Sequence, residues 1–203
     1  MKRILSWLIC LCLLIPAACV GEGAPSFDDT ALSKLPGYTL NDDGTWRCEA
    51  GAVVPYPQYD VYLYLIAEGV RGGACKAPVL VAGLFKSGTK EPSKAVSGVE
   101  LAVGHQVYTF KRMQSLETTA ELPLYTYGEK VLSFLAKADK LTVVVYYNDG
   151  NDNMNVLGQL YLNAMRPFAK ALTDGHYMDY VKDEDGSLTE LNEQYPLTER
   201  TTP

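Results

Sequence analysis

The sequence predicts an α+β fold in which an antiparallel β-sheet or sandwich carries two short amphipathic helices in its C-terminal half. Three observations lead to this class. From Tyr38 onward, short segments show strand-like alternation of apolar residues. Two segments near the end place apolar residues at helical spacing, and these helices are grouped late instead of alternating with the strands. A parallel sheet built from βαβ units needs regular alternation, so an antiparallel arrangement is favoured.

The N-terminus predicts a secretory signal peptide over residues 1–18. Lys2 and Arg3 precede an apolar run at 4–15, and small residues follow it. A membrane-spanning helix needs about 17–25 apolar residues, and Pro16 ends this run too soon. We therefore expect export; the alternative is an uncleaved anchor.

Cys19 lies where a lipoprotein signal would be cut. Bacterial lipoboxes resemble Leu-Ala-Gly/Ala-Cys, and here Pro16, Ala17 and Ala18 precede the cysteine, so two of the three positions fit. The sequence predicts acylation of Cys19 and a membrane partner reached through that lipid. The alternative is ordinary cleavage nearby, which would remove Cys19 or leave it unmodified.

The rest of the chain divides by composition. Residues 19–27 are small and polar and predict a tether, 28–180 suit a single α+β domain, and 181–203 form a polar C-terminal tail that is either a peripheral appendage or disordered. Losing residues 1–18 removes two basic residues and no acidic ones, which leaves 16 basic against 24 acidic residues, a net charge of −8. Without basic clusters, nucleic acid is excluded as a partner.

The first half of the domain is expected to consist mainly of strands. Residues 28–37 allow one or two helical turns before a Pro-Gly pair. In the segment 61–65, Val61, Leu63 and Leu65 share one face of a strand, with tyrosines on the other. Further strands are expected at 78–85, 98–104 and 106–113, the last two as a hairpin, with a loop at 86–94.

The second half of the domain shows the clearest periodicity of apolar residues. The two predicted helices place apolar residues at i, i+3, i+4 and i+7: Val131, Phe134, Leu135 and Ala138, then Met165, Phe168, Ala169 and Leu172. Asn163 can cap the second helix, and Gly175 lies just beyond its end. Between the helices, an apolar strand at 140–147 and a strand at 154–162 are expected to form a hairpin.

Catalytic signatures are absent from the sequence. The two histidines, His105 and His176, both fall in expected turns, and no G-x-S-x-G, H-E-x-x-H or P-loop motif occurs. We therefore expect a protein that is not an enzyme and that has no cofactor.

Two acidic runs resemble the start of a calcium-binding loop. The loop beginning at Asp149 has Met154 and Leu160 where an EF-hand needs glycine and glutamate, and the loop beginning at Asp183 has Leu188 and Gln194 there. We expect turns and no metal site.

Tyrosine is abundant, with 14 residues. Tyr56, Tyr59, Tyr62 and Tyr64 lie close together and form a possible ligand surface for a protein or a glycan, because aromatic planes give contact area at low entropic cost. The alternative is that these rings simply occupy half-buried strand faces.

Counting cysteines predicts a disulfide. Cys10 and Cys12 leave with the signal peptide, which leaves Cys19, Cys48 and Cys75 in an oxidising compartment. Pairing Cys48 with Cys75 and acylating Cys19 resolves the odd thiol; bonds from Cys19 to either of the others are the alternatives.

The run "GEKVLSFLAKADKLTVVVYY", followed by a strand and the short helix "NAMRPFAKAL", resembles the periplasmic proteins related to invasion-associated locus B over residues 45–173. This resemblance implies an exported, β-rich, non-enzymatic protein with a disulfide, linked to the envelope or to host surfaces. Together with the residues, it predicts a binding or structural module of the bacterial cell envelope. The alternative is a hydrolase that acts on an envelope or extracellular polymer.

Overall fold

The computed structural model describes residues 26–111, 118–124, 127–149, 152–182 and 197–202. Sheet A contains β1 (Tyr38–Leu40), β2 (Thr45–Val54), β3 (Tyr59–Val70), β4 (Val79–Lys86) and β7 (Thr119–Pro123). Sheet B contains β5 (Ala95–Val103), β6 (Gln106–Lys111), β8 (Lys140–Asp149), β9 (Asp152–Tyr161) and β10 (Leu197–Thr201). The helical elements are η1 (Leu32–Lys34), α2 (Gly128–Lys137), α3 (Met165–Asp174) and η2 (Tyr177–Tyr180).

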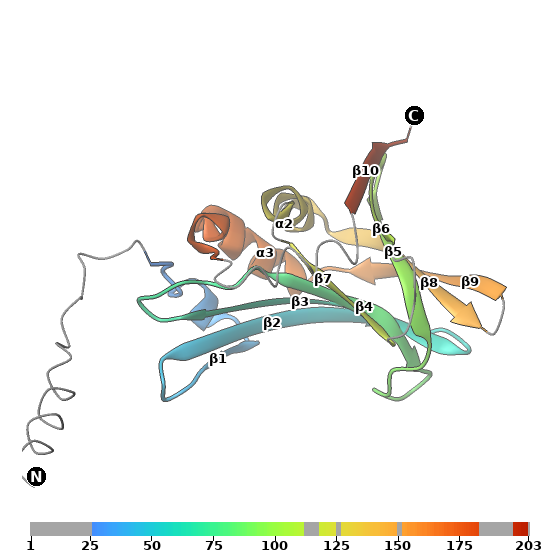
Figure 1. Ribbon diagram of the computed structural model, residues 1–203, viewed down its shortest axis with the longest axis horizontal. Helices are drawn as coiled ribbons and strands as arrows, with labels where there is room; N and C mark the ends of the chain where they lie inside the picture. The colour runs from blue at the N-terminus through green and yellow to red at the C-terminus, as the bar shows by residue number, and fades with distance from the viewer. Residues whose placement is uncertain (1–25, 112–117, 125–126, 150–151, 183–196, 203) are drawn as a thin grey trace, which may run out of the picture.

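Both sheets are antiparallel, in the orders β1-β2-β3-β4-β7 and β10-β6-β5-β8-β9. Sheet B covers one part of the inner face of sheet A, and the pair α2 and α3 lies over the other part (Figure 1). The predicted α+β class with two helices in the C-terminal half is confirmed. No helix among the described residues is long and apolar enough to cross a membrane.

The strand β3 forms the middle of sheet A. It pairs with β2 over ten residues and with β4 over eight residues. Val61, Leu63 and Leu65 are fully buried on the inner face, as the alternation predicts. The other half of the sandwich core comes from the apolar residues Val143 and Val145 of β8 and Val99 and Leu101 of β5.

The two amphipathic helices are present and bury the predicted residues. All eight apolar positions of the two helical patterns are buried in the core. The N-terminus of α3 differs from the expectation, because Ala164 precedes the helix and no side chain caps it, so Asn163 is not a capping residue. Beyond the C-terminal Gly175, the left-handed conformation is adopted by His176, with φ 52°.

Both ends of the domain extend further than the composition indicates. Phe27, expected in the tether, is buried and packs against Trp46, Tyr177 and Tyr180 with ring centroids 4.9 to 5.9 Å apart. In the segment expected to be a polar tail, Leu197–Thr201 form β10 and pair with β6 along their whole length. Polar side chains suit this strand because it lies at the edge of sheet B. The expected acidic run at 183–194 lies outside the described residues.

The packing of α3 makes a stability prediction. Phe168 is fully buried, so Phe168→Ala should lower the free energy of unfolding by about 3–5 kcal/mol through lost burial and a residual cavity. The exposed Lys170, on the opposite side of the same helix and paired with Asp174, is the control, and Lys170→Ala should lower it by about 0.5 kcal/mol or less. Urea denaturation of the two variants measures both values. Equal effects would mean that α3 does not pack as described.

Candidate functional site

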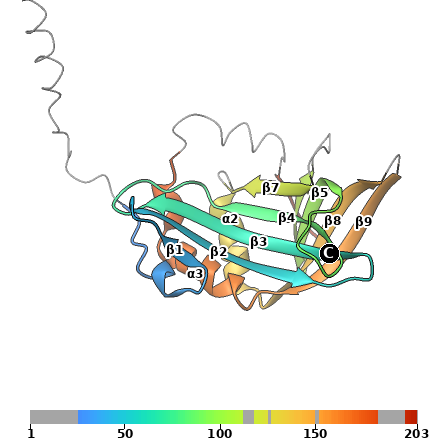
Figure 2. The ribbon, with the colours of Figure 1, turned by 90° about the horizontal axis from the view of Figure 1, so that it is seen from below.

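The outer face of sheet A, turned away from sheet B and the helices, carries the most unusual surface of the described structure. In a two-layer antiparallel fold this face normally holds polar side chains. Here the ladder places Tyr64 between Gly51 and Val81, and Tyr62 between Val53 and Gly83. No described helix or strand covers these positions when the molecule is viewed from that side (Figure 2). We call Val53, Tyr62, Tyr64, Val81 and Phe85 the aromatic face.

Two glycines make room for the tyrosine rings close to the sheet. A side chain at Gly83 would lie 2.6 Å from the Tyr62 hydroxyl, and one at Gly51 would overlap the ring of Tyr64. Each ring therefore crosses the neighbouring strand at a position that has no side chain. The two rings can therefore lie over the neighbouring strands, although their planes are tilted by 58° to one another.

The rings also contact one another. Phe85 stacks on Tyr62 with ring centroids 4.0 Å apart and an interplanar angle of 19°, and Tyr64 lies 5.9 Å from Tyr62. Tyr62 is only 2% exposed, whereas Tyr64 and Phe85 are partly exposed and Val53 is 45% exposed. Tyr62 is thus the buried support, and the other side chains present the surface.

Burial has a chemical consequence for Tyr62. Its hydroxyl has no hydrogen-bond partner among the described residues, and desolvation raises the pKa of Tyr62 well above its usual range. A buried phenol that stays neutral at this position is suited to packing.

The four tyrosines of the expected ligand surface do not form one patch. Tyr59 has the same parity as Val61 and turns inward, where its ring meets Tyr147 edge-on at 5.8 Å. Tyr56 precedes β3, and its backbone N–H lies 3.4 Å from Asp60. Tyr62 and Tyr64 alone share the outer face, as the alternation predicts. The ladder adds Phe85, Val81 and Val53, which extending the period-2 pattern to β2 and β4 would have found.

A charged cluster continues the outer face toward the other end of the strands. Arg47 donates hydrogen bonds to Glu49 and Glu68, and Lys76 donates one to Glu68 at 3.2 Å. Partial burial is the largest single influence on Glu68 and favours its neutral form. The hydrogen bonds and charges of Lys76 and Arg47 together outweigh it, so the pKa of Glu68 is lowered. These charges are paired with one another beside the aromatic face.

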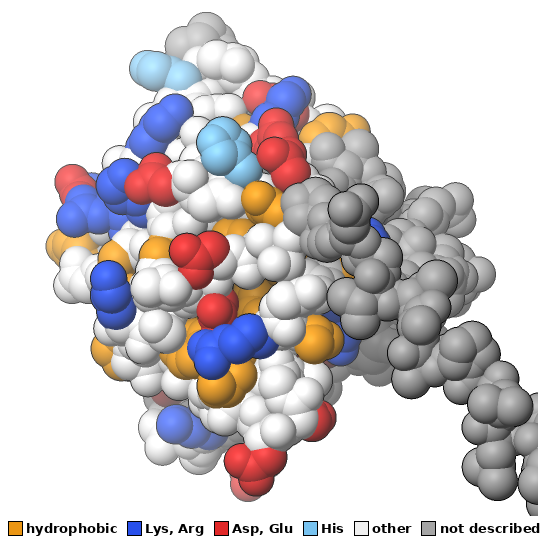
Figure 3. All heavy atoms as spheres, turned by 90° about the vertical axis from the view of Figure 1, so that its left-hand side faces the viewer, with side chains coloured by type: hydrophobic (Ala, Val, Ile, Leu, Met, Phe, Trp, Pro, Cys, Tyr) orange, Lys and Arg blue, Asp and Glu red, His pale blue; other side chains and the backbone are white. Residues whose placement is uncertain are grey.

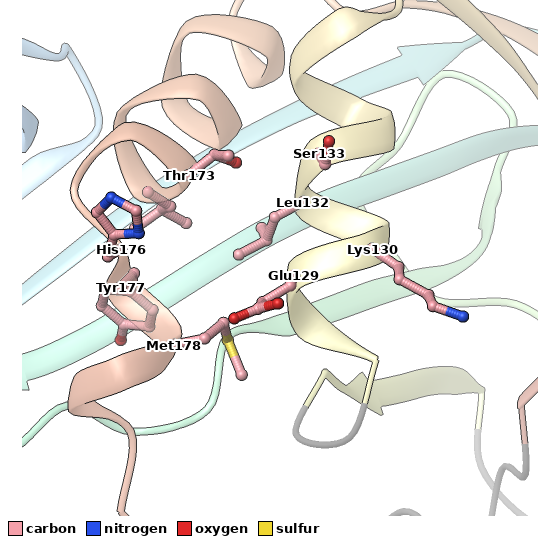
Figure 4. Close-up of a pocket in the computed structure, with 9 residues that line it drawn as sticks. Glu129, Lys130, Leu132, Ser133, Thr173, His176, Tyr177 and Met178 are labelled. Carbon is pink, nitrogen blue, oxygen red and sulfur yellow. The ribbon is translucent and has the colours of Figure 1, made fainter.

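A second candidate is the groove between α2 and the segment that follows α3 (Figure 4). It has a volume of about 420 Å³ and is lined by Glu129, Lys130, Leu132, Ser133, Leu172, Thr173, His176, Tyr177 and Met178. Glu129 points across the groove toward Met178 and Tyr177, whereas Lys130 points away, toward Glu199 of β10 at 3.1 Å.

One hydroxyl of the groove is already engaged in a helix. The Thr173 hydroxyl donates to the Ala169 carbonyl at 2.9 Å, so its proton is engaged in the helix. Among the described lining residues Glu129 is the one carboxylate, so the two-carboxylate arrangement of glycoside hydrolysis is not formed here. Around this end of the molecule, acidic and basic side chains are mixed, with hydrophobic side chains in small separate areas (Figure 3).

The remaining titratable candidates lie in turns. His105 and Gly104 connect β5 to β6, and the His105 carbonyl accepts hydrogen bonds from the backbone and the hydroxyl of Thr202. Within the described ranges, no group of three or more His, Cys, Asp or Glu residues could hold a metal ion.

Cys48 and Cys75 are free and buried, so the structure does not contain the expected disulfide. The ladder explains why. Cys48 of β2 is opposite Ala67 on one side of β3, whereas Cys75 bridges Gly69 on the other side. Neighbouring strands lie about 4.8 Å apart, and the two cysteines are also offset by two residues along β3. The two Cα atoms are therefore separated by roughly 12 Å, beyond the about 7 Å that a disulfide allows.

Each cysteine instead behaves as a small core residue. Burial raises the pKa of the Cys48 thiol to about 12 and that of Cys75 to about 11. Cys75 also ties the loop after β3 to η2, because its N–H donates to the Tyr180 carbonyl at 3.1 Å.

Comparison with known proteins gives no match: no family model, no curated protein and no solved structure is similar to this chain. The resemblance to invasion-associated locus B proteins therefore stays a prediction from the sequence.

The thiol environments make a reactivity prediction. At pH 8 the folded chain should leave Cys48 and Cys75 unmodified by iodoacetamide, because both are buried and the reactive thiolate is disfavoured by the raised pKa values. In denaturant without reductant both should react, as peptide mapping by mass spectrometry would detect. A linked pair of Cys48 and Cys75 peptides that resists alkylation in denaturant would show instead that the disulfide forms.

Proposed function

We propose that this protein is an exported lipoprotein of the bacterial cell envelope that acts as a non-enzymatic binding module through the aromatic face of sheet A. The observation that carries the proposal is the placement of Tyr64, Phe85 and Val53 on a sheet face where polar residues are usual. Solvent-facing apolar surface with polar surroundings is typical of a ligand site.

The geometry favours a glycan as the ligand. The partly exposed rings of Tyr64 and Phe85 offer contact area to the apolar face of a sugar ring. The charged cluster at Arg47, Glu68 and Lys76 supplies donors and acceptors on the same face of the sheet. A peptide is the alternative ligand, since Tyr also serves protein recognition.

Envelope location rests on the N-terminal sequence. The basic residues, the apolar run and the small residues before Cys19 support export and acylation. A lipid on Cys19 would hold the domain at a membrane while the aromatic face is presented to its ligand.

Titration against oligosaccharides from the bacterial envelope tests the binding role. Tyr64→Ala and Phe85→Ala should each weaken binding about two- to tenfold, the equivalent of about 0.5–1.5 kcal/mol for an aromatic contact. Leu40→Ala, which removes an exposed apolar side chain from the same sheet, is the matched control and should bind as the wild type does. If peptides bind and glycans do not, the ligand class is wrong. Polymer cleavage that Glu129→Gln abolishes would favour the hydrolase alternative.

Mass spectrometry tests the anchor. Intact protein extracted from membranes should carry a diacylglyceryl or triacyl group on Cys19, because the small residues Ala17 and Ala18 precede a cysteine that can accept the lipid. Cys19→Ser is the control and should remain unprocessed. An unmodified N-terminus at another residue would contradict lipidation.

A further inference from the structure

The edge of sheet B formed by β9 is the longest uncharged strand edge in the described sheets. Exposed strand edges invite pairing with another strand, and proteins block them with short strands, charges or proline. The edge strand β7 contains Glu121 and Pro123, and β10 contains Glu199 and Arg200. The three-residue β1 covers only the first part of β2, and the open remainder of β2 is short, running from Glu49 to the residue before Pro55. In contrast β9 has ten residues, and after its first residue no charged residue or proline follows until Arg166.

The backbone of this edge is open among the described residues. The Leu162 N–H donates to the Asp139 carbonyl at 2.9 Å, which fixes the phase of the β8–β9 ladder. Because hydrogen-bonded and non-hydrogen-bonded pairs alternate, even-numbered residues of β9 bond to β8 and odd-numbered residues point outward. The outward set is Asn153, Asn155, Leu157, Gln159 and Tyr161, and no described backbone group outside sheet B bonds to it. Figure 2 shows β9 as the outermost strand of its sheet.

The same edge exposes apolar side chains. Leu157 is 50% exposed and Tyr161 is 68% exposed, both on the face of sheet B that points away from sheet A. The strand itself is held firmly, since Leu160 is fully buried and Gly158 lets β9 approach Val61 of β3. A rigid strand with unpaired amides and exposed apolar residues is suited to strand addition.

We infer that β9 pairs antiparallel with β9 of a second copy of this chain, with the two-fold axis at Leu157. In this register Leu157 faces its own equivalent and Asn155 faces Gln159 of the partner copy. All five outward residues then meet outward residues, so every unpaired N–H and C=O of the set finds a partner.

Side-chain pairing favours a copy of the same chain over a different strand. In this register Leu157 packs on its own equivalent and the amide of Asn155 meets that of Gln159. The chain has a net charge of −6, which opposes self-association, but no charged residue lies between Asn153 and Tyr161, so the repulsion is weaker at this edge than at a charged one.

The dimer should be weak in solution. A single pair of edge strands belongs with interfaces below about 1,200 Å², which are typical of transient encounters. Confinement to a membrane through the proposed lipid would raise the effective concentration and favour the dimer. The pairing itself does not depend on that anchor or on the ligand of the aromatic face.

The test is the oligomeric state of the full-length chain, purified in a mild detergent. Light scattering should show a dimer fraction that rises with protein concentration. Leu157→Lys should reduce association at least tenfold, because it places two like charges opposite each other at the axis. Leu40→Lys makes the same change at an exposed apolar residue on β1 and should dimerise as the wild type does. A chain that stays monomeric up to about 1 mM, or a dimer that Leu157→Lys leaves intact, would overturn the inference.

Cysteine cross-linking tests the register and does not depend on the lysine variant folding. At the axis the two Cα atoms of a hydrogen-bonded pair lie about 5.5 Å apart, within disulfide range. Leu157→Cys should therefore give a covalent dimer on mild oxidation, above the background of the wild-type chain with its five cysteines. Tyr161→Cys is the control: its side chain is more exposed, but the two copies would lie roughly 27 Å apart. Stronger cross-linking at 161 than at 157 would refute this pairing.

Discussion

The burial of the inner face of β3 is the constraint on which the rest of the structure depends. From Val61 to Gly69 every second residue is buried, and the side chains become smaller along the strand, ending in Ala67 and Gly69. At the Val61 end the strand lies under β9, where Gly158 permits close approach. At the other end the indole of Trp46 lies against Gly69, and Phe27 and Tyr177 pack around it. The inner face of β3 is thus covered by sheet B along its first half. Along its second half it is covered by the aromatic cluster of Trp46, Phe27 and Tyr177.

That constraint also decides what the outer face can present. Because side chains alternate strictly, fixing Leu63 and Leu65 inward fixes Tyr62 and Tyr64 outward, and a slip of one residue would exchange the two faces. The loss of about 1.5–3 kcal/mol for each large apolar side chain left exposed makes such a slip unfavourable. The aromatic face is therefore held by the core behind it. Gly51 and Gly83 then let the rings lie over the neighbouring strands without a clash.

Much of this arrangement could be predicted from the sequence, because it depends on local periodicity. The alternation of apolar residues predicts which residues lie on each face of β3, and the helical spacing of apolar residues predicts which residues of α2 and α3 are buried. Features that depend on which strands pair with one another cannot be predicted from local periodicity. Cys48 and Cys75 looked like partners by counting, but only the order of strands shows that β3 separates them. The edge strand β10 is polar because an edge tolerates it, so composition alone made it resemble a tail. Tyr59 lies close in sequence to the other tyrosines, but its parity places it on the face of Val61.

The two surfaces proposed here are geometrically linked. A two-fold axis that joins two β9 edges into one continuous sheet runs perpendicular to that sheet, so it keeps each face of sheet B on its own side. Both copies of sheet A would then lie on the same side of the joined sheet, and both aromatic faces would point in the same direction, away from it. Two weak sites that face the same direction can bind a single extended polymer together. Once the first site has bound, the second binding event is intramolecular, so the overall affinity rises through effective concentration without any additional contact. A modest edge-to-edge dimer would in this way strengthen binding to a repeating envelope ligand more than either aromatic face could alone.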